Sequence, residues 1–112
     1  MINNVLTIKT GKKDLPILPE YWTSAKFDEK KQELDNLFFT KTGVHIYTSS
    51  KPIREICFLI KKSTSINHLL ELSKKLKNKF GISCFQASID RTNNTAHLLF
   101  TWIDKEGKSI VL

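Results

Sequence analysis

The sequence is poor in the residues that cross-link or break up small proteins. It has two cysteines, four glycines and three prolines among its 112 residues. Cys57 and Cys84 each lie inside an apolar, strand-like run, where a free thiol behaves as a small hydrophobic residue. We therefore expect both cysteines to be core residues and not members of a redox or metal site.

Long hydrophobic runs are missing as well. No stretch approaches the roughly 18 apolar residues of a membrane span, and the segment Met1–Asn4 lacks the basic and then apolar build of a signal peptide. We expect a cytoplasmic protein without a membrane partner. A composition of 40% hydrophobic and 26% charged residues predicts one small globular domain over residues 1–112.

Arginine is rare, and lysine supplies nearly all of the positive charge. The eighteen Lys and Arg residues exceed the eleven Asp and Glu residues to give a net charge of +7, with arginine only at Arg54 and Arg91. Lysine is a flexible point charge that binds phosphate backbones without reading sequence, so the excess favours a polyanionic partner. A lysine-rich surface that only keeps the protein soluble is the alternative.

The first half of the chain predicts a strand followed by a helix. Val5–Lys9 alternates like a strand, and residues 1–23 as a whole are expected to be partly extended. A helix is expected from Ser24, a candidate N-cap, to Gly43, a candidate C-cap. Val44–Tyr47 has the composition of a short edge strand.

The second half contains the clearest elements. Arg54–Lys61 holds five consecutive apolar residues, which predicts a central strand that is covered on both faces. A helix with an N-cap among Ser63–Ser65 carries an apolar stripe and ends at Gly81. Strands then follow, with a polar connector that suits an antiparallel hairpin: Ile82–Asp90, Ala96–Ile103 and a possible last strand at Ser109–Leu112.

This order of strand, helix, strand, helix, strand, strand predicts an α+β fold. We expect a small antiparallel or mixed sheet of about four to five strands, with the two helices packed on one face.

Several short segments in the second half carry a resemblance to a known family. They are Lys-Phe-Gly-Ile at 79–82, Phe-Gln at 85–86, Phe-Thr-Trp-Ile-Asp at 100–104 and Gly-Lys-Ser-Ile at 107–110. Over about Pro52 to Leu112, half of the chain, the sequence resembles the N-terminal domain of relaxases, the mobilisation proteins of Bacteroidetes mobile elements. The resemblance implies a central antiparallel sheet flanked by helices. Relaxases of this kind nick one DNA strand with a tyrosine nucleophile and a divalent metal held by histidines.

The metal positions that the resemblance implies are degenerate in this chain. They fall on Asp90, on Thr95 and on His97, and only His97 is a histidine. An ion that orients a scissile phosphate needs about three converging ligands. His45 and His68 belong to other elements. We therefore treat Asp90 and His97 as vestigial metal-site positions, and we expect no metal and no cofactor.

No residue matches the family's catalytic tyrosine. Tyr21 and Tyr47 are the only tyrosines, and neither lies in a stretch that matches. Tyr21 and Trp22 serve either as a hydrophobic anchor or as a base-stacking surface. The chain also has no phosphate-cradling glycine loop and no Ser-His-Asp set. We expect no catalytic residues and no enzymatic activity.

These observations together favour binding without catalysis. We expect a mobile-element protein that binds RNA, DNA or a protein–RNA complex such as a CRISPR effector, acting as a counter-defence factor of the anti-CRISPR type. One alternative is a relaxase-related protein that binds single-stranded transfer-origin DNA, and another is a protein-binding module without nucleic acid. The expected polyanion contacts are Lys74, Lys75, Lys77, Lys79 and Arg91. The lysines have a structural alternative, because cations near a helix C-terminus stabilise its dipole.

Overall fold

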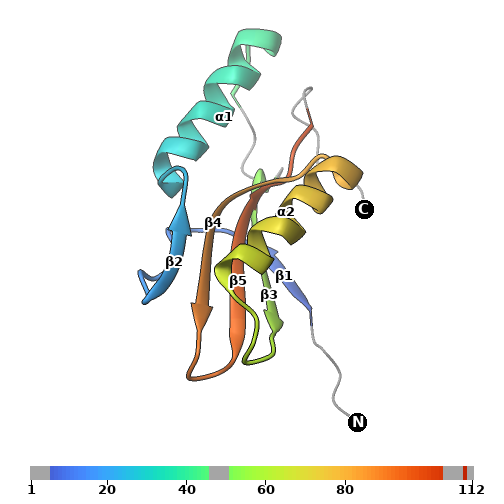
Figure 1. Ribbon diagram of the computed structural model, residues 1–112. Helices are drawn as coiled ribbons and strands as arrows, with labels where there is room; N and C mark the ends of the chain where they lie inside the picture. The colour runs from blue at the N-terminus through green and yellow to red at the C-terminus, as the bar shows by residue number, and fades with distance from the viewer. Residues whose placement is uncertain (1–5, 46–50, 105–109, 111–112) are drawn as a thin grey trace.

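Two helices and five strands make up the fold in the computed structural model, which describes residues 6–45, 51–104 and 110 (Figure 1). The strands form one sheet in the order β1-β3-β5-β4-β2, and every neighbouring pair is antiparallel. The α+β prediction and the expected number of strands are confirmed. The elements are β1 (Thr7–Thr10), β2 (Glu20–Thr23), α1 (Phe27–Thr42), β3 (Ile53–Leu59), α2 (Ile66–Phe80), β4 (Ser83–Asp90) and β5 (Thr95–Thr101).

The two helices do not share a face of the sheet, which corrects the expected arrangement. Leu69 of α2 packs with Leu98 and other residues on one face, whereas Phe27 of α1 packs with Leu99 on the opposite face. Leu98 and Leu99 are successive residues of β5, so their side chains point to opposite sides. Figure 1 shows α2 lying across the sheet, while α1 extends past the end of it. Phe27, the first residue of α1, belongs to the buried cluster on that face, and Leu34, halfway along the helix, packs against the cluster.

The middle of the sheet is β5, not the segment Arg54–Lys61 that was expected there. That segment corresponds to β3, which is an inner strand between β1 and β5. Ile56 is buried, but Cys57 and Phe58 are half-buried and Leu59 is exposed. The dense apolar run indicated an inner strand correctly, but the cover over its two faces is incomplete.

The start of α1 is held by residues distant in sequence. Ser24 is not its N-cap: Lys26 occupies that position and makes no side-chain cap, and the amide of Phe27 donates instead to Oδ1 of Asp14 at 2.7 Å. Gln86 of β4 is fully buried and donates to the same Asp14 oxygen. The Gln86 amide also accepts from the backbone N–H of Leu15 at 2.9 Å. One buried amide therefore joins the β1–β2 connection to the sheet.

Local signals determine the other three helix ends. Ser65 is the N-cap of α2, as the Ser63–Ser65 cluster predicted, and it also forms a capping box with His68. Gly43 and Gly81 close α1 and α2 with φ values of +76° and +79°. Both glycines adopt the left-handed conformation that a C-cap of this kind requires.

The N-terminal half contains an edge strand, β2, that the sequence did not predict. Within it, Trp22 packs against the core cluster on the α2 side and Tyr21 against the cluster on the other side. These contacts confirm the anchor interpretation of the two aromatic residues. The expected strand Val44–Tyr47 is wrong at Val44 and His45, which are in no strand, and its remainder lies outside the described residues.

The C-terminal end contributes one described contact to the sheet. Ile110 donates its backbone N–H to the carbonyl of Trp102 at 3.0 Å, and the indole N–H of Trp102 donates to the carbonyl of Ile110 at 3.1 Å. The remainder of the expected strand Ser109–Leu112 lies outside the described residues. No helix in the described part of the chain has the length and apolar character needed to span a membrane.

Candidate functional site

Three polar side chains meet on the face of the sheet opposite α2. Glu55 and Cys57 are two residues apart on β3, so they project from the same face. The antiparallel register places Cys57 directly opposite His97 of β5. Because Ala96 and Leu98 pack in the core cluster on the α2 side, His97 must face the other way. Strand alternation and register alone therefore bring the three residues together.

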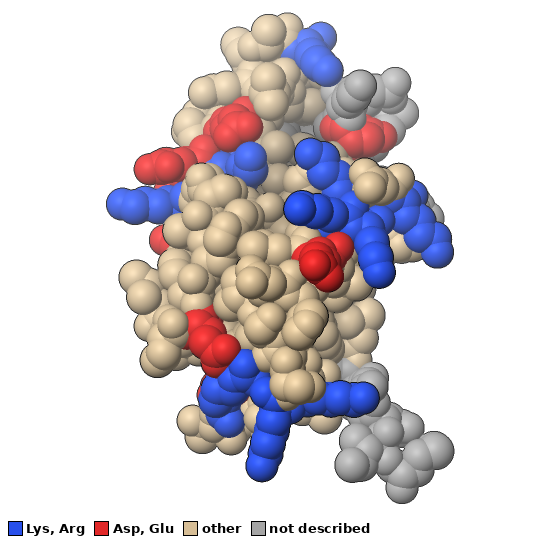
Figure 2. All heavy atoms as spheres, viewed as in Figure 1, with Lys and Arg blue, Asp and Glu red and all other residues tan. Residues whose placement is uncertain are grey.

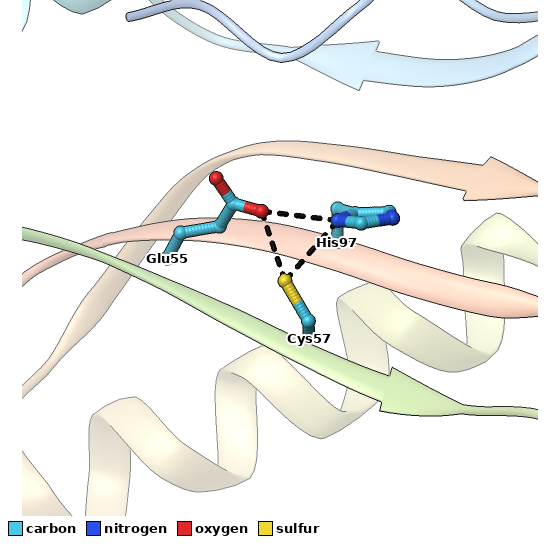
Figure 3. Close-up of side chains that lie close together, drawn as sticks. All are labelled: Glu55, Cys57 and His97. Carbon is cyan, nitrogen blue, oxygen red and sulfur yellow. Dashed lines mark hydrogen bonds and ion pairs between the residues drawn. The ribbon is translucent and has the colours of Figure 1, made fainter. Parts of the chain in front are cut away.

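The donor atoms of this cluster lie within hydrogen-bonding distance of one another. Nδ1 of His97 is 3.0 Å from Oε2 of Glu55 and 3.2 Å from Sγ of Cys57. The Cys57 thiol donates to the same Glu55 oxygen at 2.9 Å. Figure 3 shows the three side chains pointing toward a common centre on the side of the sheet away from α2. We call Glu55, Cys57 and His97 the β3–β5 cluster.

The cluster perturbs two of its own ionisable groups. The hydrogen bond from His97 lowers the pKa of Glu55 below its ordinary value, and this effect outweighs the opposing effect of burial. Burial, aided by the hydrogen bond to Glu55, raises the pKa of Cys57 to about 12. Lys9 of β1 approaches Glu55 from the rim, with Nζ 3.7 Å from Oε2. At neutral pH the cluster therefore holds a thiol beside a carboxylate.

A groove opens beside the cluster. It has a volume of about 600 Å³ and is lined by Glu55 and His97 together with residues of β4 and of the β1–β2 connection. Ser88 of β4 contributes to its wall and stands directly opposite His97 in the β4–β5 register. Ser88 is 0% exposed, and its hydroxyl has no hydrogen-bond partner among the described residues. Buried hydroxyls are normally paired with protein or with water, so this hydroxyl can bond to a group that enters the groove.

Asp90 does not join the cluster. Its carboxylate accepts from the backbone N–H of Thr92 at 2.9 Å and from the side-chain amide of Asn93 at 2.9 Å. The hydrogen bond from Asn93 lowers the pKa of Asp90 below its ordinary value. Asp90 therefore shapes the β4–β5 turn, and of the two vestigial positions only His97 belongs to a group of converging donors.

Arg91 is engaged within the protein. Its guanidinium forms a two-pronged ion pair with Glu20 of β2, including a 2.7 Å bond from Nη2 to Oε1. It also donates to the backbone carbonyls of Lys62, at 3.1 Å, and of Thr64. A polyanion would have to displace these contacts, so the geometry separates Arg91 from the lysines with which it was grouped.

The four lysines of α2 are all exposed. Within the described ranges, no ion pair involves Lys74, Lys75 or Lys77, and Lys79 lies over the ring of Phe80 at 5.3 Å. Figure 2 shows basic side chains gathered at the end of α2, and a second group near the β3–α2 and β4–β5 connections. The lysine face is therefore accessible to a ligand.

The sequence prediction missed two members of the cluster. Glu55 was not considered as a donor, and Cys57 was assigned to the core. Cys57 is instead half-buried with two polar contacts, whereas Cys84 packs against the core cluster on the α2 side, as expected. The available signal was the Glu-x-Cys spacing, because residues two apart on a strand share a face.

Comparisons with known proteins provide no relative from which a role could be transferred. No family model matches this chain, no curated protein matches it, and no solved structure matches its fold.

Proposed function

We propose that this protein binds the phosphate backbone of a nucleic acid, without catalysis, through the lysine face of α2. The observation that supports this proposal most directly is that Lys74, Lys75 and Lys77 are exposed and have no acidic partner among the described residues. A lysine that serves only helix stability needs no such freedom, whereas a phosphate contact requires it. The net charge of +7 strengthens the attraction at longer range.

The physical basis is counterion release. Each lysine that neutralises a phosphate frees a condensed cation, so affinity falls steeply with salt. Lys61 and Lys62, exposed in the β3–α2 connection just before the helix, extend the basic surface toward the N-terminal end of α2. Lysine contacts of this kind give affinity without sequence selectivity.

The resemblance to mobilisation proteins bears on the identity of the partner. It implies a mobile-element setting, in which a small protein that binds without catalysis can act as a counter-defence factor on an RNA or on a protein–RNA complex such as a CRISPR effector. This step rests on that setting and not on any residue of the chain. Single-stranded transfer-origin DNA is the alternative within the same proposal. Capture from a host that carries an RNA-guided nuclease separates the two: recovery of the effector with its guide supports counter-defence, and recovery of DNA alone excludes it.

The proposal is tested by measuring binding to labelled single-stranded RNA and DNA. Fluorescence anisotropy gives the affinity at each concentration of a salt series. The test variant is the triple variant Lys74→Gln, Lys75→Gln, Lys77→Gln. The control is the triple variant Lys26→Gln, Lys30→Gln, Lys31→Gln. It removes the same charge from the N-cap and the first turns of α1, a helix on which Figure 2 shows acidic and basic side chains mixed.

We expect the α2 variant to lose affinity and to lower the slope of log K against log salt by about 0.7 for each lysine removed. The α1 variant should change both quantities less. Equal losses of affinity in the two variants would show that only the net charge matters and not the position of the lysines. A shallow slope of log K against log salt in the unaltered protein would exclude binding to the phosphate backbone.

A further inference from the structure

We propose that Glu55, Cys57 and His97, the β3–β5 cluster, form a zinc(II)-binding site on the face of the sheet opposite α2. The site is distinct from the lysine surface of α2, and its ligands are not the histidine set that the resemblance implies.

The first argument is the spacing of the donors. A tetrahedral zinc ion lies about 2.0–2.3 Å from nitrogen, oxygen and sulfur ligands, so neighbouring ligands are roughly 3.3–3.7 Å apart. The three donor atoms here are separated by 2.9 Å, 3.0 Å and 3.2 Å. The separations need to widen by about 0.3–0.6 Å, most for the sulfur–oxygen pair. Such a change is within the reach of side-chain rotation on two paired strands.

The second argument is the chemistry of the donors. Thiolate, imidazole and carboxylate together suit zinc, whereas calcium and magnesium take oxygen ligands. As the zinc–sulfur bond forms, the Cys57 thiol gives its proton to solvent. His97, whose Nδ1 now donates to Glu55, must hold its remaining proton on Nε2, so that the lone pair of Nδ1 can bind the ion. The resulting thiolate and the Glu55 carboxylate balance the charge of the ion. Lys9, now paired with Glu55 at 3.7 Å, is 58% exposed and can turn outward.

The third argument comes from outside the three ligands. Ser88 is fully buried on the wall of the adjoining groove, opposite His97, and no residue that the structure describes bonds to its hydroxyl. A fourth ligand such as a zinc-bound water in the groove would give this hydroxyl a partner. Three protein ligands with a fourth position open to a groove is the arrangement of a site that can still bind an exogenous ligand.

The fourth argument is that the ligands are carried by rigid elements of the fold. Its ligands come from β3 and β5, two inner strands that pair along their whole described length. Strand-borne ligands are held more precisely than loop-borne ligands. Within the described ranges, no second group of three histidine, cysteine or acidic residues lies as close together.

The test uses the full chain, purified under reducing conditions and stripped with a chelator. Zinc(II) binding is measured by competition with a chromophoric chelator, and cobalt(II) is used as a spectroscopic substitute. We expect one ion per chain and a sulfur-to-cobalt charge-transfer band. Metal binding and the charge-transfer band should both be lost in Cys57→Ser. In His97→Gln, the affinity for the metal should fall and the band should lose intensity. Cys84→Ser, which alters the thiol packed on the other face, is the matched control and should retain both.

Circular dichroism of each variant without metal establishes that it is folded. Thermal unfolding provides a second measurement: zinc should raise the Tm of the unaltered protein and of Cys84→Ser, but not that of Cys57→Ser. Binding that persists unchanged in Cys57→Ser, or a cobalt complex without a thiolate band, would refute the site. So would a failure of the unaltered chain to take up zinc. None of these outcomes depends on nucleic-acid binding, which is tested separately with lysine variants.

Discussion

Arg91 holds both carboxylate oxygens of Glu20, a residue 71 positions earlier in the chain. The pair joins the first residue of edge strand β2 to the start of the β4–β5 turn. The same guanidinium donates to two carbonyls of the β3–α2 connection, at Lys62 and Thr64. One arginine side chain therefore ties together three segments at this end of the sheet.

Replacing Arg91 by lysine should loosen this end of the sheet. Lysine keeps the charge but loses the planar fork, so it cannot serve both Glu20 oxygens and two carbonyls at once. We expect Arg91→Lys to lower the Tm and to increase hydrogen exchange in β2. Glu20→Gln should also increase hydrogen exchange at the same β2 amides. If the two variants left β2 exchange unchanged, the ion pair would be only a surface contact.

Gln86→Leu should be strongly destabilising although it keeps the volume of the side chain. The buried amide bonds to the Leu15 N–H, to Asp14 and to the Ala25 carbonyl, and leucine removes all three bonds. Asp14 and the Ala25 carbonyl each keep another donor, whereas the Leu15 N–H loses its partner. We expect the free energy of unfolding to fall by about 2–3 kcal/mol, since a buried unpaired polar group costs roughly 1–3 kcal/mol. Urea unfolding measures the change. The exposed Gln32→Leu is the control and should change stability by less than about 0.5 kcal/mol.

Alanine should be tolerated differently at two glycines. A Cβ at Gly11 would lie 2.8 Å from Cγ2 of Ile53, which is buried, so overpacking should cost about 1–3 kcal/mol. A Cβ at Gly43 meets nothing within 4 Å, and only its φ of +76° opposes alanine. That conformational penalty is about 1–2 kcal/mol. Urea unfolding measures both losses of stability. Hydrogen exchange separates their causes: Gly11→Ala should also lower the protection of the β1–β3 amides, and Gly43→Ala should not.

Stability should fall at alkaline pH because of Cys84. Burial raises the pKa of this thiol from the ordinary value of 9.0 to about 12 in the folded protein. Between these values the unfolded chain loses the proton and the folded chain keeps it, so the folded state loses stability as pH rises from about 9 toward 12. The slope is at most about 1.4 kcal/mol per pH unit.

The comparison of Cys84→Ala with the unaltered protein isolates this slope from the titration of lysine and tyrosine. Urea unfolding at several pH values should show a shallower decline in the variant above pH 9. Parallel declines in the two proteins would mean that the thiol does not titrate differently in the folded state.

Features that depend on neighbouring residues were predictable from the sequence. The N-cap at Ser65 and the glycine caps at Gly43 and Gly81 arise within one helical turn, so short patterns determine them. The cap of α1 was predicted wrongly at Ser24 because the acceptor is Asp14, thirteen residues before Phe27. Long-range partners of this kind leave no local pattern.

The β3–β5 cluster illustrates the same limit at the candidate site. The Glu-x-Cys spacing shows that Glu55 and Cys57 share a face of a strand, but only the register between β3 and β5 places His97 opposite them. Register is set by packing across the whole sheet and not by the residues of one strand. The sequence therefore identifies the donor residues, but it does not show that they lie close together in the fold.

The two outermost strands of the sheet, β1 and β2, are only four residues long each. An incoming strand from another molecule would find few free backbone groups to pair with on either side. Short edges are one of the means by which β proteins avoid edge-to-edge aggregation. The longest strands, β3, β4 and β5, all lie between neighbours. The fold thus places its longest strands, which offer the most backbone hydrogen-bonding groups, inside the sheet. We therefore expect the folded chain to be a poor template for strand addition by other chains.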